Sequence, residues 1–128
     1  MSKYHSQKAI VNGIAFDSLK EARRYSVLLL LQKAGEISDL QMQVPFELLP
    51  PQYEESTEVY KSGKNKGKQK PKKLLERGVN YIADFVYVRD GKIVVEDTKG
   101  YKQGQAYALF VVKRKLMLYK YGIKVQEV

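Results

Sequence analysis

The fold is decided by the stretch VNYIADFVYVRDGKIVVEDTKG, residues 79–100. Two runs rich in β-branched and aromatic residues flank Asp90-Gly91, a dipeptide that favours the two-residue turn of a β-hairpin. When the strands are paired outward from this turn, Asp84 falls directly opposite Asp97, with Cβ atoms about 5 Å apart. The sequence therefore predicts two adjacent carboxylates at the open end of the hairpin.

Side chains alternate along a strand, so Lys99 falls on the same face as Asp84 and Asp97. The rest of that face is apolar and is expected to pack against a helix; its members are Ile82, Val86, Val88, Ile93 and Val95. Two carboxylates this close repel each other unless positive charge lies between them, and a divalent cation would supply more than Lys99 alone. A one-residue slip would bring Glu96 to this face, which makes Glu96 a reserve ligand. The open alternative is an ordinary polar turn.

The chain around the hairpin predicts the order α-β-β-β-α-β. The elements are a helix from Asp17 or Ser18 to Gly35, a strand over 39–50 interrupted by Pro45, strands over 79–88 and 92–99, a helix over 103–122 with Gly122 as its cap, and a strand over 123–128. Residues 1–10 are predicted to form a loose basic arm, and residues 11–16 a short strand or turn. This order predicts an α/β (α+β) fold in one domain, residues 1–128.

The amino-acid composition limits which ligands and which metal-binding residues the protein can use. Lysine and arginine outnumber aspartate and glutamate by 23 to 14, a balance typical of proteins that bind polyanions such as DNA. The chain has no cysteine and one histidine, His5, so a metal would be held by carboxylates and carbonyls, which favours Mg²⁺ or Mn²⁺.

No signal peptide is evident, and the longest apolar run, Val27 to Leu31, is too short to span a membrane. We expect a soluble, cytoplasmic protein.

A lysine-rich segment interrupts the predicted core. Residues 61–73 include seven lysines and no large apolar side chain, so we expect a flexible loop at about 54–76. The functional interpretation is contact with DNA phosphates, and the alternative is a solvated linker. The candidate DNA-binding residues are Lys61, Lys64, Lys66, Lys68, Lys70, Lys72 and Lys73.

Asp84, together with Asp97-Thr98-Lys99, resembles the signature of the PD-(D/E)XK nuclease superfamily, with Ala83-Asp84 standing where the first motif has Pro-Asp. The chain also resembles small phage and prophage proteins with the layout F-x-S-x-x-E-A, YIADF, VVEDxKG and a C-terminal YG-I. Those proteins are taken as recombination nucleases or Holliday-junction resolvases. The resemblance covers roughly residues 10–128 apart from the lysine-rich segment.

This resemblance implies a restriction-endonuclease-like core with a central mixed sheet flanked by helices, and a homodimeric, metal-dependent endonuclease acting on branched DNA. Mg²⁺ or Mn²⁺ would be held by Asp84, Asp97 and the Thr98 carbonyl, while Lys99 orients water or stabilises charge. Glu21 would complete the metal site. Its alternative role is a capping box with Ser18, since the two form the pattern S-x-x-E.

Further candidates lie outside these motifs. The resemblance also implies that Lys113 points at the phosphate near the metal. Arg114 and Lys115 suit contacts with the DNA backbone, and equally a solvated helix face. Gln43 is a candidate polar group near the site, and Tyr101 or Tyr107 could stack on unpaired bases. The rival functions are a nuclease of the same fold acting on linear duplex or flap DNA, and a basic DNA-binding protein without catalysis.

Overall fold

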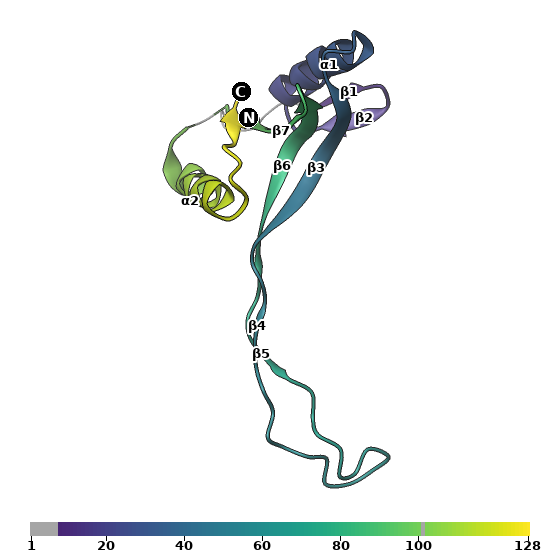
Figure 1. The fold of residues 1–128 in the computed structure, drawn as a ribbon, viewed down its shortest axis with the longest axis vertical. Coiled ribbons are helices and arrows are strands. Elements are labelled where there is room, and N and C mark those ends of the chain that lie inside the picture. The colour runs from purple at the N-terminus through teal and green to yellow at the C-terminus, as the bar shows by residue number, and fades with distance from the viewer. Residues whose placement is uncertain (1–7, 101) are drawn as a thin grey trace. The chain divides into compact units, whose positions relative to one another are not determined.

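The computed structural model describes residues 8–100 and 102–128, so the predictions for residues 1–7, which include His5, and for Tyr101 lie outside the described residues. The elements in Figure 1 are β1 (Ala9–Val11), β2 (Ile14–Phe16), α1 (Leu19–Lys33), β3 (Ser38–Leu49), β4 (Gln52–Glu54), β5 (Lys73–Glu76), β6 (Val79–Arg89), β7 (Lys92–Asp97), α2 (Gly104–Tyr121) and β8 (Gln126–Glu127). Within these ranges no helix is long and apolar enough to cross a membrane.

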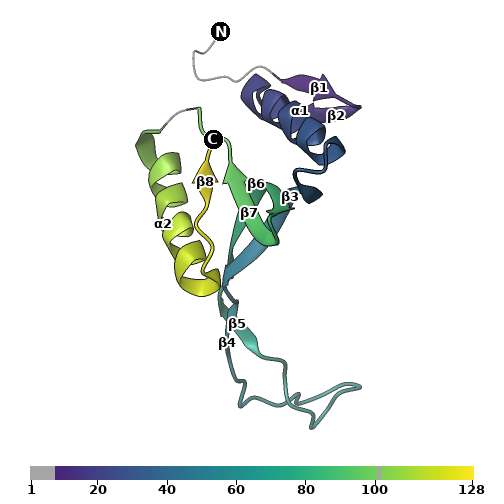
Figure 2. The ribbon, with the colours of Figure 1, turned by 45° about the horizontal axis from the view of Figure 1, so that its top comes forward.

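The chain divides into two compact units. The first contains the described residues up to Phe46 and those from Tyr81 onward, and the second is Glu47–Asn80. In the first unit the four-stranded sheet has the order β3-β6-β7-β8, with β6 and β7 antiparallel and β7 and β8 parallel. In Figures 1 and 2 these strands lie between α1 and α2. The predicted α-β-β-β-α-β order and mixed sheet are confirmed.

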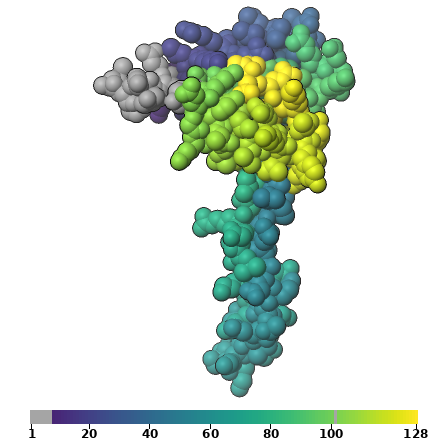
Figure 3. Space-filling view, turned by 90° about the vertical axis from the view of Figure 1, so that its left-hand side faces the viewer, coloured from purple at the N-terminus to yellow at the C-terminus, as the bar shows by residue number. Residues whose placement is uncertain are grey.

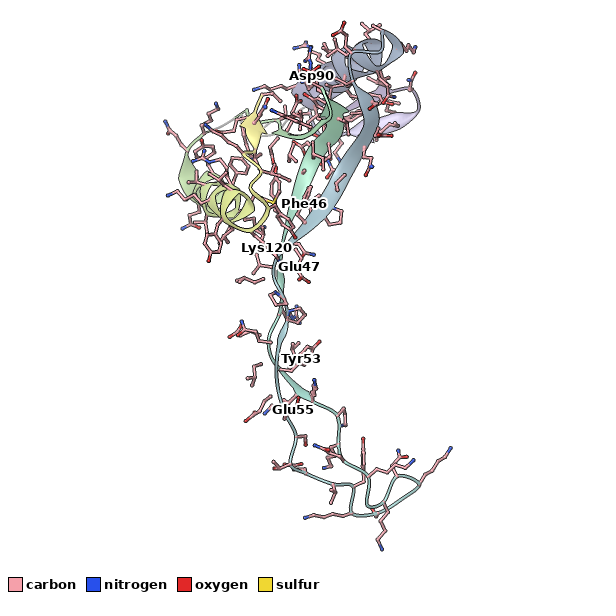
Figure 4. All side chains as sticks on the ribbon, in the orientation of Figure 1. Phe46, Glu47, Tyr53, Glu55, Asp90 and Lys120 are labelled. Carbon is pink, nitrogen blue, oxygen red and sulfur yellow. The ribbon has the colours of Figure 1, made fainter. Side chains whose placement is uncertain are left out.

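The predicted hairpin register is confirmed. Asp90 and Gly91 form the turn with positive φ values of 52° and 74°, which the mirror-image turns of hairpins require (Asp90 is labelled in Figure 4). Arg89 pairs with Lys92, and the ladder runs to Phe85 and Glu96. Asp84 and Asp97 are the next residues outward on their strands, so they lie where the ladder ends.

The prediction of which hairpin face is buried was wrong for β6, whereas Val95 of β7, which lies on the predicted face, is fully buried. The buried side chains of β6 are Tyr81, Ala83, Phe85 and Tyr87, whereas Ile82 on the opposite face is 55% exposed. Phe85 and Tyr87 pack with Tyr25 and Leu28 of α1 in the main apolar cluster. Both faces of β6 are apolar, so alternation alone could not choose between them. The aromatic face is buried because α1 presents its own aromatic and leucine side chains to it.

Helix α1 begins and ends at local signals that the sequence predicted. The Ser18 hydroxyl accepts a hydrogen bond from the Glu21 amide at 3.1 Å, which caps the first turn. Gly35 follows the helix with a φ of 79°. α1 is tied to β7 by Arg24, whose guanidinium donates to the fully buried Glu96 carboxylate at 2.5 and 2.7 Å. This ion pair fixes the helix to the strand that carries Asp97.

The second helix packs elsewhere on the first unit. Phe110 and Met117 of α2 are buried, and the Phe110 ring lies 6.2 Å from that of Tyr81. Gly122 ends α2 in the left-handed conformation, at a φ of 67°, as predicted. After it the chain returns as β8 beside β7, where the Val128 amide donates to the Asp97 carbonyl at 2.9 Å. The last strand therefore holds the end of β7 in place.

The N-terminal hairpin differs from the sequence prediction. Ala9 and Ile10, predicted as part of a loose arm, belong to β1, which pairs with β2 around an Asn12-Gly13 turn. Both turn residues have positive φ values, 52° and 75°. Asn-Gly is itself a strong hairpin signal, but the flanking strands have only three residues each.

The second unit has more regular structure than the loop predicted at about 54–76. β5 lies within that range and pairs with β4. Gln69 of the lysine-rich segment forms an isolated antiparallel bridge with Val59, which precedes the segment. The segment's lysines are exposed except for Lys70, which is half-buried. Lys70 pairs with Glu58 at 3.3 Å, and Lys72 pairs with Glu55 at 3.1 Å. In Figure 4 the side chains of Tyr53 and Glu55 project from this part of the chain.

The Arg24–Glu96 pair generates a stability prediction. Replacing Arg24 with Ala leaves a fully buried carboxylate without its cation, so we expect the free energy of unfolding to fall by about 3 kcal/mol. Urea denaturation measures this change. Arg23→Ala is the matched control, because Arg23 is the exposed neighbour on the same helix and should cost no more than about 0.5 kcal/mol. Equal losses for the two variants would contradict the prediction.

Candidate functional site

Asp97 lies at the end of β7 and has a partner on each oxygen. Its Oδ1 is 2.9 Å from the Lys99 ammonium, and its Oδ2 accepts a hydrogen bond from the Tyr81 hydroxyl at 2.6 Å. The side chain is almost fully buried. Burial and the bond to Asp97 raise the pKa of Tyr81 well above its usual range, so Tyr81 stays protonated and keeps donating. The two partners fix the carboxylate in one orientation.

Asp84 lies beside Asp97 at the open end of the hairpin. Its Oδ2 accepts the Thr98 amide at 2.8 Å, and its Oδ1 accepts the Gln43 side-chain amide at 3.2 Å. Gln43 has a φ of 52° within β3, a backbone irregularity in that strand. Burial raises the pKa of Asp84, and the charge of Asp97 adds to this, although both hydrogen bonds oppose it. The predicted neighbourhood of Asp84, Asp97 and Gln43 is thus present.

Glu21 adds a third carboxylate from α1. Burial, first, and then the charges of Asp84, Asp17 and Asp97 raise the pKa of Glu21 from 4.5 to about 7. Among the described residues its carboxylate accepts no hydrogen bond, so the reciprocal half of the predicted capping box is not formed. Ser18 caps the helix alone, and the Glu21 carboxylate stays available beside the two aspartates.

Lys99 is the cation of this cluster. Its ammonium lies 3.9 Å from the centre of the Phe110 ring while it contacts Asp97, so α2 supplies a cation–π support. The Lys20 ammonium donates to the Lys99 carbonyl at 2.5 Å, which ties the first turn of α1 to the same segment. Lys99 is therefore held between the two helices and the sheet.

Glu96, the reserve ligand, does not join the site. The register did not slip, and Glu96 instead accepts hydrogen bonds from Arg24 and the Tyr87 hydroxyl. Because Glu96 is fully buried and paired, it acts as a structural anchor next to Asp97 along the strand.

The carboxylate oxygens of the site are of the kind that hard divalent cations prefer, although the Lys99 ammonium already contacts Asp97. Over residues 8–100 and 102–128, no three acidic or histidine side chains stand close enough to hold a metal together. Both carboxylate oxygens of Asp97 already have partners, Lys99 and Tyr81. Two observations favour a cation: the raised pKa values of Glu21 and Asp84, and the Thr98 hydroxyl, which is buried without a partner in the described structure. A cation bound at Asp97 Oδ1 would have to displace the Lys99 ammonium, which lies 2.9 Å from that oxygen.

Two cavities adjoin Glu21. One, of about 350 Å³, is lined by Ser18, Glu21, Thr98 and Gly100 among others. The other, of about 420 Å³, is lined by residues of β2 and β3 that include Gln43. Glu21 thus lines both cavities.

The predicted basic residues of α2 are Lys113, Arg114 and Lys115. No hydrogen bond or ion pair in the described structure joins Lys113 to Asp84 or Asp97. Arg114 donates to Glu127 at 3.1 Å, and the Tyr107 hydroxyl donates to the same carboxylate at 2.7 Å. Lys115 is exposed. The structure therefore brings Glu21, Asp84, Asp97, Thr98 and Lys99 together, and among the described residues Lys113 makes no direct polar contact with them.

Comparison with known proteins identifies the family. A family model described as "Protein of unknown function (DUF1064)" matches residues 1–127, across both compact units. The chain belongs to the DUF1064 family. No curated protein and no solved structure matches it.

Several residues around this DUF1064 site were missed by sequence reasoning. Tyr81 and Phe110 contact Asp97 and Lys99, and Arg24 holds the strand beside them. Tyr81 lies three residues before Asp84. Because side chains alternate along a strand, this separation predicts that Tyr81 and Asp84 lie on opposite faces of the sheet. Arg24 follows Glu21 by about one helical turn, so the two residues lie on the same face of α1. This spacing was the sequence feature that could have predicted a role for Arg24 beside the site.

The raised pKa of Glu21 predicts that the free energy of unfolding depends on pH. The folded pKa of about 7 exceeds the ordinary value of 4.5, so the ionised form of Glu21 destabilises the folded protein as pH rises through that window. With chelator present, Glu21→Gln should therefore be increasingly more stable than wild type between about pH 5 and 8, measured by urea denaturation. The exposed Glu76→Gln is the control and should show a constant offset. A Glu21→Gln advantage that is flat or shrinks with pH would contradict the prediction.

Proposed function

We propose that this DUF1064 protein is a divalent-metal-dependent DNA endonuclease of the PD-(D/E)XK type. It hydrolyses phosphodiester bonds in branched DNA such as a Holliday junction, in the cytoplasm, which is that of a bacterial host if a phage encodes it. The observation that carries the proposal is the convergence of Asp84, Asp97 and Lys99 at one end of the β6–β7 hairpin. Glu21 of α1 adds a carboxylate whose pKa is raised to about 7.

Mg²⁺ or Mn²⁺ would be held by Asp84, Asp97 and the Thr98 carbonyl, with Glu21 completing the set. When bound, the ion supplies Lewis-acid stabilisation of the phosphate and a lower pKa for water. Hard oxygen donors suit both ions. Within the described residues Lys99 is the cation in direct contact with these carboxylates, and their remaining negative charge is the proposed driving force for cation binding.

The chain's own residues then act on the phosphate. Lys99, released from Asp97, presents its ammonium to the charge that builds on phosphorus, and Phe110 limits where that ammonium can move. Tyr81 keeps donating to Asp97, so the carboxylate stays oriented after Lys99 leaves. Gln43 and the Thr98 amide hold Asp84 in the same way.

The positive charge of the protein would attract the phosphates of the DNA backbone. The net charge of +9 favours a polyanion, and the exposed lysines of the second unit, with Lys115 and Arg114, are proposed phosphate contacts. Resolution of a junction needs cuts in two symmetric strands, so we expect a homodimer. Lys113 remains a proposed phosphate contact of the same general kind.

Cleavage of a labelled four-way junction, beside a linear duplex of the same sequence, tests the proposal. With Mg²⁺ or Mn²⁺ we expect paired nicks in the junction only, and none with chelator. Lys99→Ala and Asp97→Asn should lower the rate by about 100-fold or more, because each removes a group that acts on the reacting phosphate or its metal, while junction binding is retained.

Lys92→Ala and Asp90→Asn are matched controls, since they make the same changes at exposed positions of the same hairpin and should cleave at the wild-type rate. Equal cutting of both substrates would keep the site and favour a nuclease for linear or flap DNA. Salt-sensitive binding without any cutting would contradict the endonuclease and favour a non-catalytic DNA-binding protein.

A further inference from the structure

A third cavity, of about 440 Å³, is lined by residues of α2 and of the segment that contains β8. Figure 3 looks onto this side of the first unit, where α2, in green to yellow, and the last residues, in yellow, form one surface. The cavity shares no lining residue with the two that adjoin Glu21. We refer to it as the β8 pocket, and its lining residues are Arg114, Lys115, Leu118, Lys124, Val125 and Glu127.

The β8 pocket carries more positive than negative charge. Arg114 and Lys115 come from α2, and Lys124 comes from the segment before β8, so the fold brings together cations that lie apart in the sequence. Glu127 is the acid among the described lining residues. Within the described ranges Lys115 and Lys124 are exposed and form no ion pair, so their charges remain free for a ligand.

Glu127 holds Arg114 in place rather than opposing a ligand. Its two oxygens accept hydrogen bonds from the Tyr107 hydroxyl at 2.7 Å and from Arg114 Nη1 at 3.1 Å. The bond from Tyr107, first, and then the charges of Lys102 and Arg114 lower the pKa of Glu127, so the carboxylate stays ionised and keeps its partners. A guanidinium has five N–H groups, so Arg114 can donate to a second acceptor while it contacts Glu127.

The donors of the pocket suit a phosphate. One guanidinium and two ammonium groups face an acceptor that needs several hydrogen bonds and negative charge, and phosphate oxygens meet both needs. Leu118, which is 52% exposed, adds an apolar wall. The sugar next to a backbone phosphate can cover such a wall, whereas free phosphate cannot. A phosphodiester of a nucleic-acid strand therefore fits the lining better than inorganic phosphate does.

β8 places the pocket beside the carboxylate site. Glu127 pairs with Asp97 in the parallel ladder, and paired strands lie about 4.8 Å apart. Both sites also meet α2, because Lys99 lies over the Phe110 ring and Glu127 accepts from Tyr107, and the two rings are 5.9 Å apart. A strand with one phosphate at Lys99 can thus place a neighbouring phosphate at the pocket.

We propose that the β8 pocket binds a phosphate of the DNA backbone next to the one that is cut, through Arg114, Lys115 and Lys124. The identity of the ligand as DNA rests on the proposed function, whereas the pocket and its charges stand on the contacts described above. Glu127 and Tyr107 position Arg114 for this contact. The pocket holds the strand and does not act on the reacting atoms.

The salt dependence of binding to a labelled four-way junction tests the proposal, with chelator in place of metal. In Lys115→Ala/Lys124→Ala one phosphate contact is lost, so the slope of log affinity against log salt should become shallower by about 1. Lys33→Ala/Lys92→Ala is the matched control, since it removes the same charge at exposed positions of the first unit and should keep the wild-type slope. Equal slopes for the two double variants would overturn the pocket as a DNA contact.

Inorganic phosphate separates the two sources of the ligand. It is titrated into the protein while the amide signals of Leu118 and Val125 are followed by NMR, in wild type and in Lys115→Ala/Lys124→Ala. Shifts that disappear in the variant, together with an unchanged junction slope, would assign the pocket to free phosphate and overturn the DNA contact. A junction slope that falls in the pocket variant and not in the control supports the backbone phosphate.

Cleavage kinetics separate this proposal from the endonuclease itself. Lys115→Ala/Lys124→Ala should raise KM several-fold and leave kcat within about twofold of wild type, because the held phosphate does not react, whereas Lys99→Ala lowers kcat. A kcat loss as large as that of Lys99→Ala would contradict the holding role. Junction binding with the predicted slope change but without cutting would remove the endonuclease and keep the pocket. Cutting with an unchanged slope would do the reverse.

Discussion

The candidate site depends on the ion pair between Arg24 of α1 and Glu96 of β7. Glu96 is fully buried, so it must be paired, and Arg24 meets both of its oxygens. Arg24 lies one turn after Glu21, and Glu96 immediately precedes Asp97. The pair therefore fixes the one helix and the one strand that carry the site's acids, and Lys20 adds a second tie to the Lys99 carbonyl.

The same arrangement concentrates negative charge at a cost to stability. Burial and like charges raise the pKa values of Glu21 and Asp84, and in the described structure Lys99 is the cation in direct contact with these acids. A site that served only the fold would avoid such a cluster, because apolar or paired side chains there would be more stable. The contact between Lys99 and Asp97 is the one that a cation bound at Asp97 Oδ1 would replace.

Local signals predicted much of the fold and part of the site. Asp90-Gly91 defined the hairpin register, and Ser18 and Gly122 defined helix ends, because each acts within a few residues of itself. Asp84, Asp97 and Lys99 came together for the same reason. The buried face of β6, and the contacts of Tyr81 and Phe110, depend on which helix packs where, and alternation within one strand carries no such information.

A crystal grown with Mn²⁺ tests the central claim most directly, since the anomalous signal locates the ion without any assumption about activity. The account predicts a peak bound by Asp84 and Asp97, with the Lys99 ammonium displaced from Asp97 Oδ1, and loss of that peak in Asp84→Asn. An Mn²⁺-soaked crystal with no peak at these carboxylates, and with Lys99 still 2.9 Å from Asp97, would contradict it.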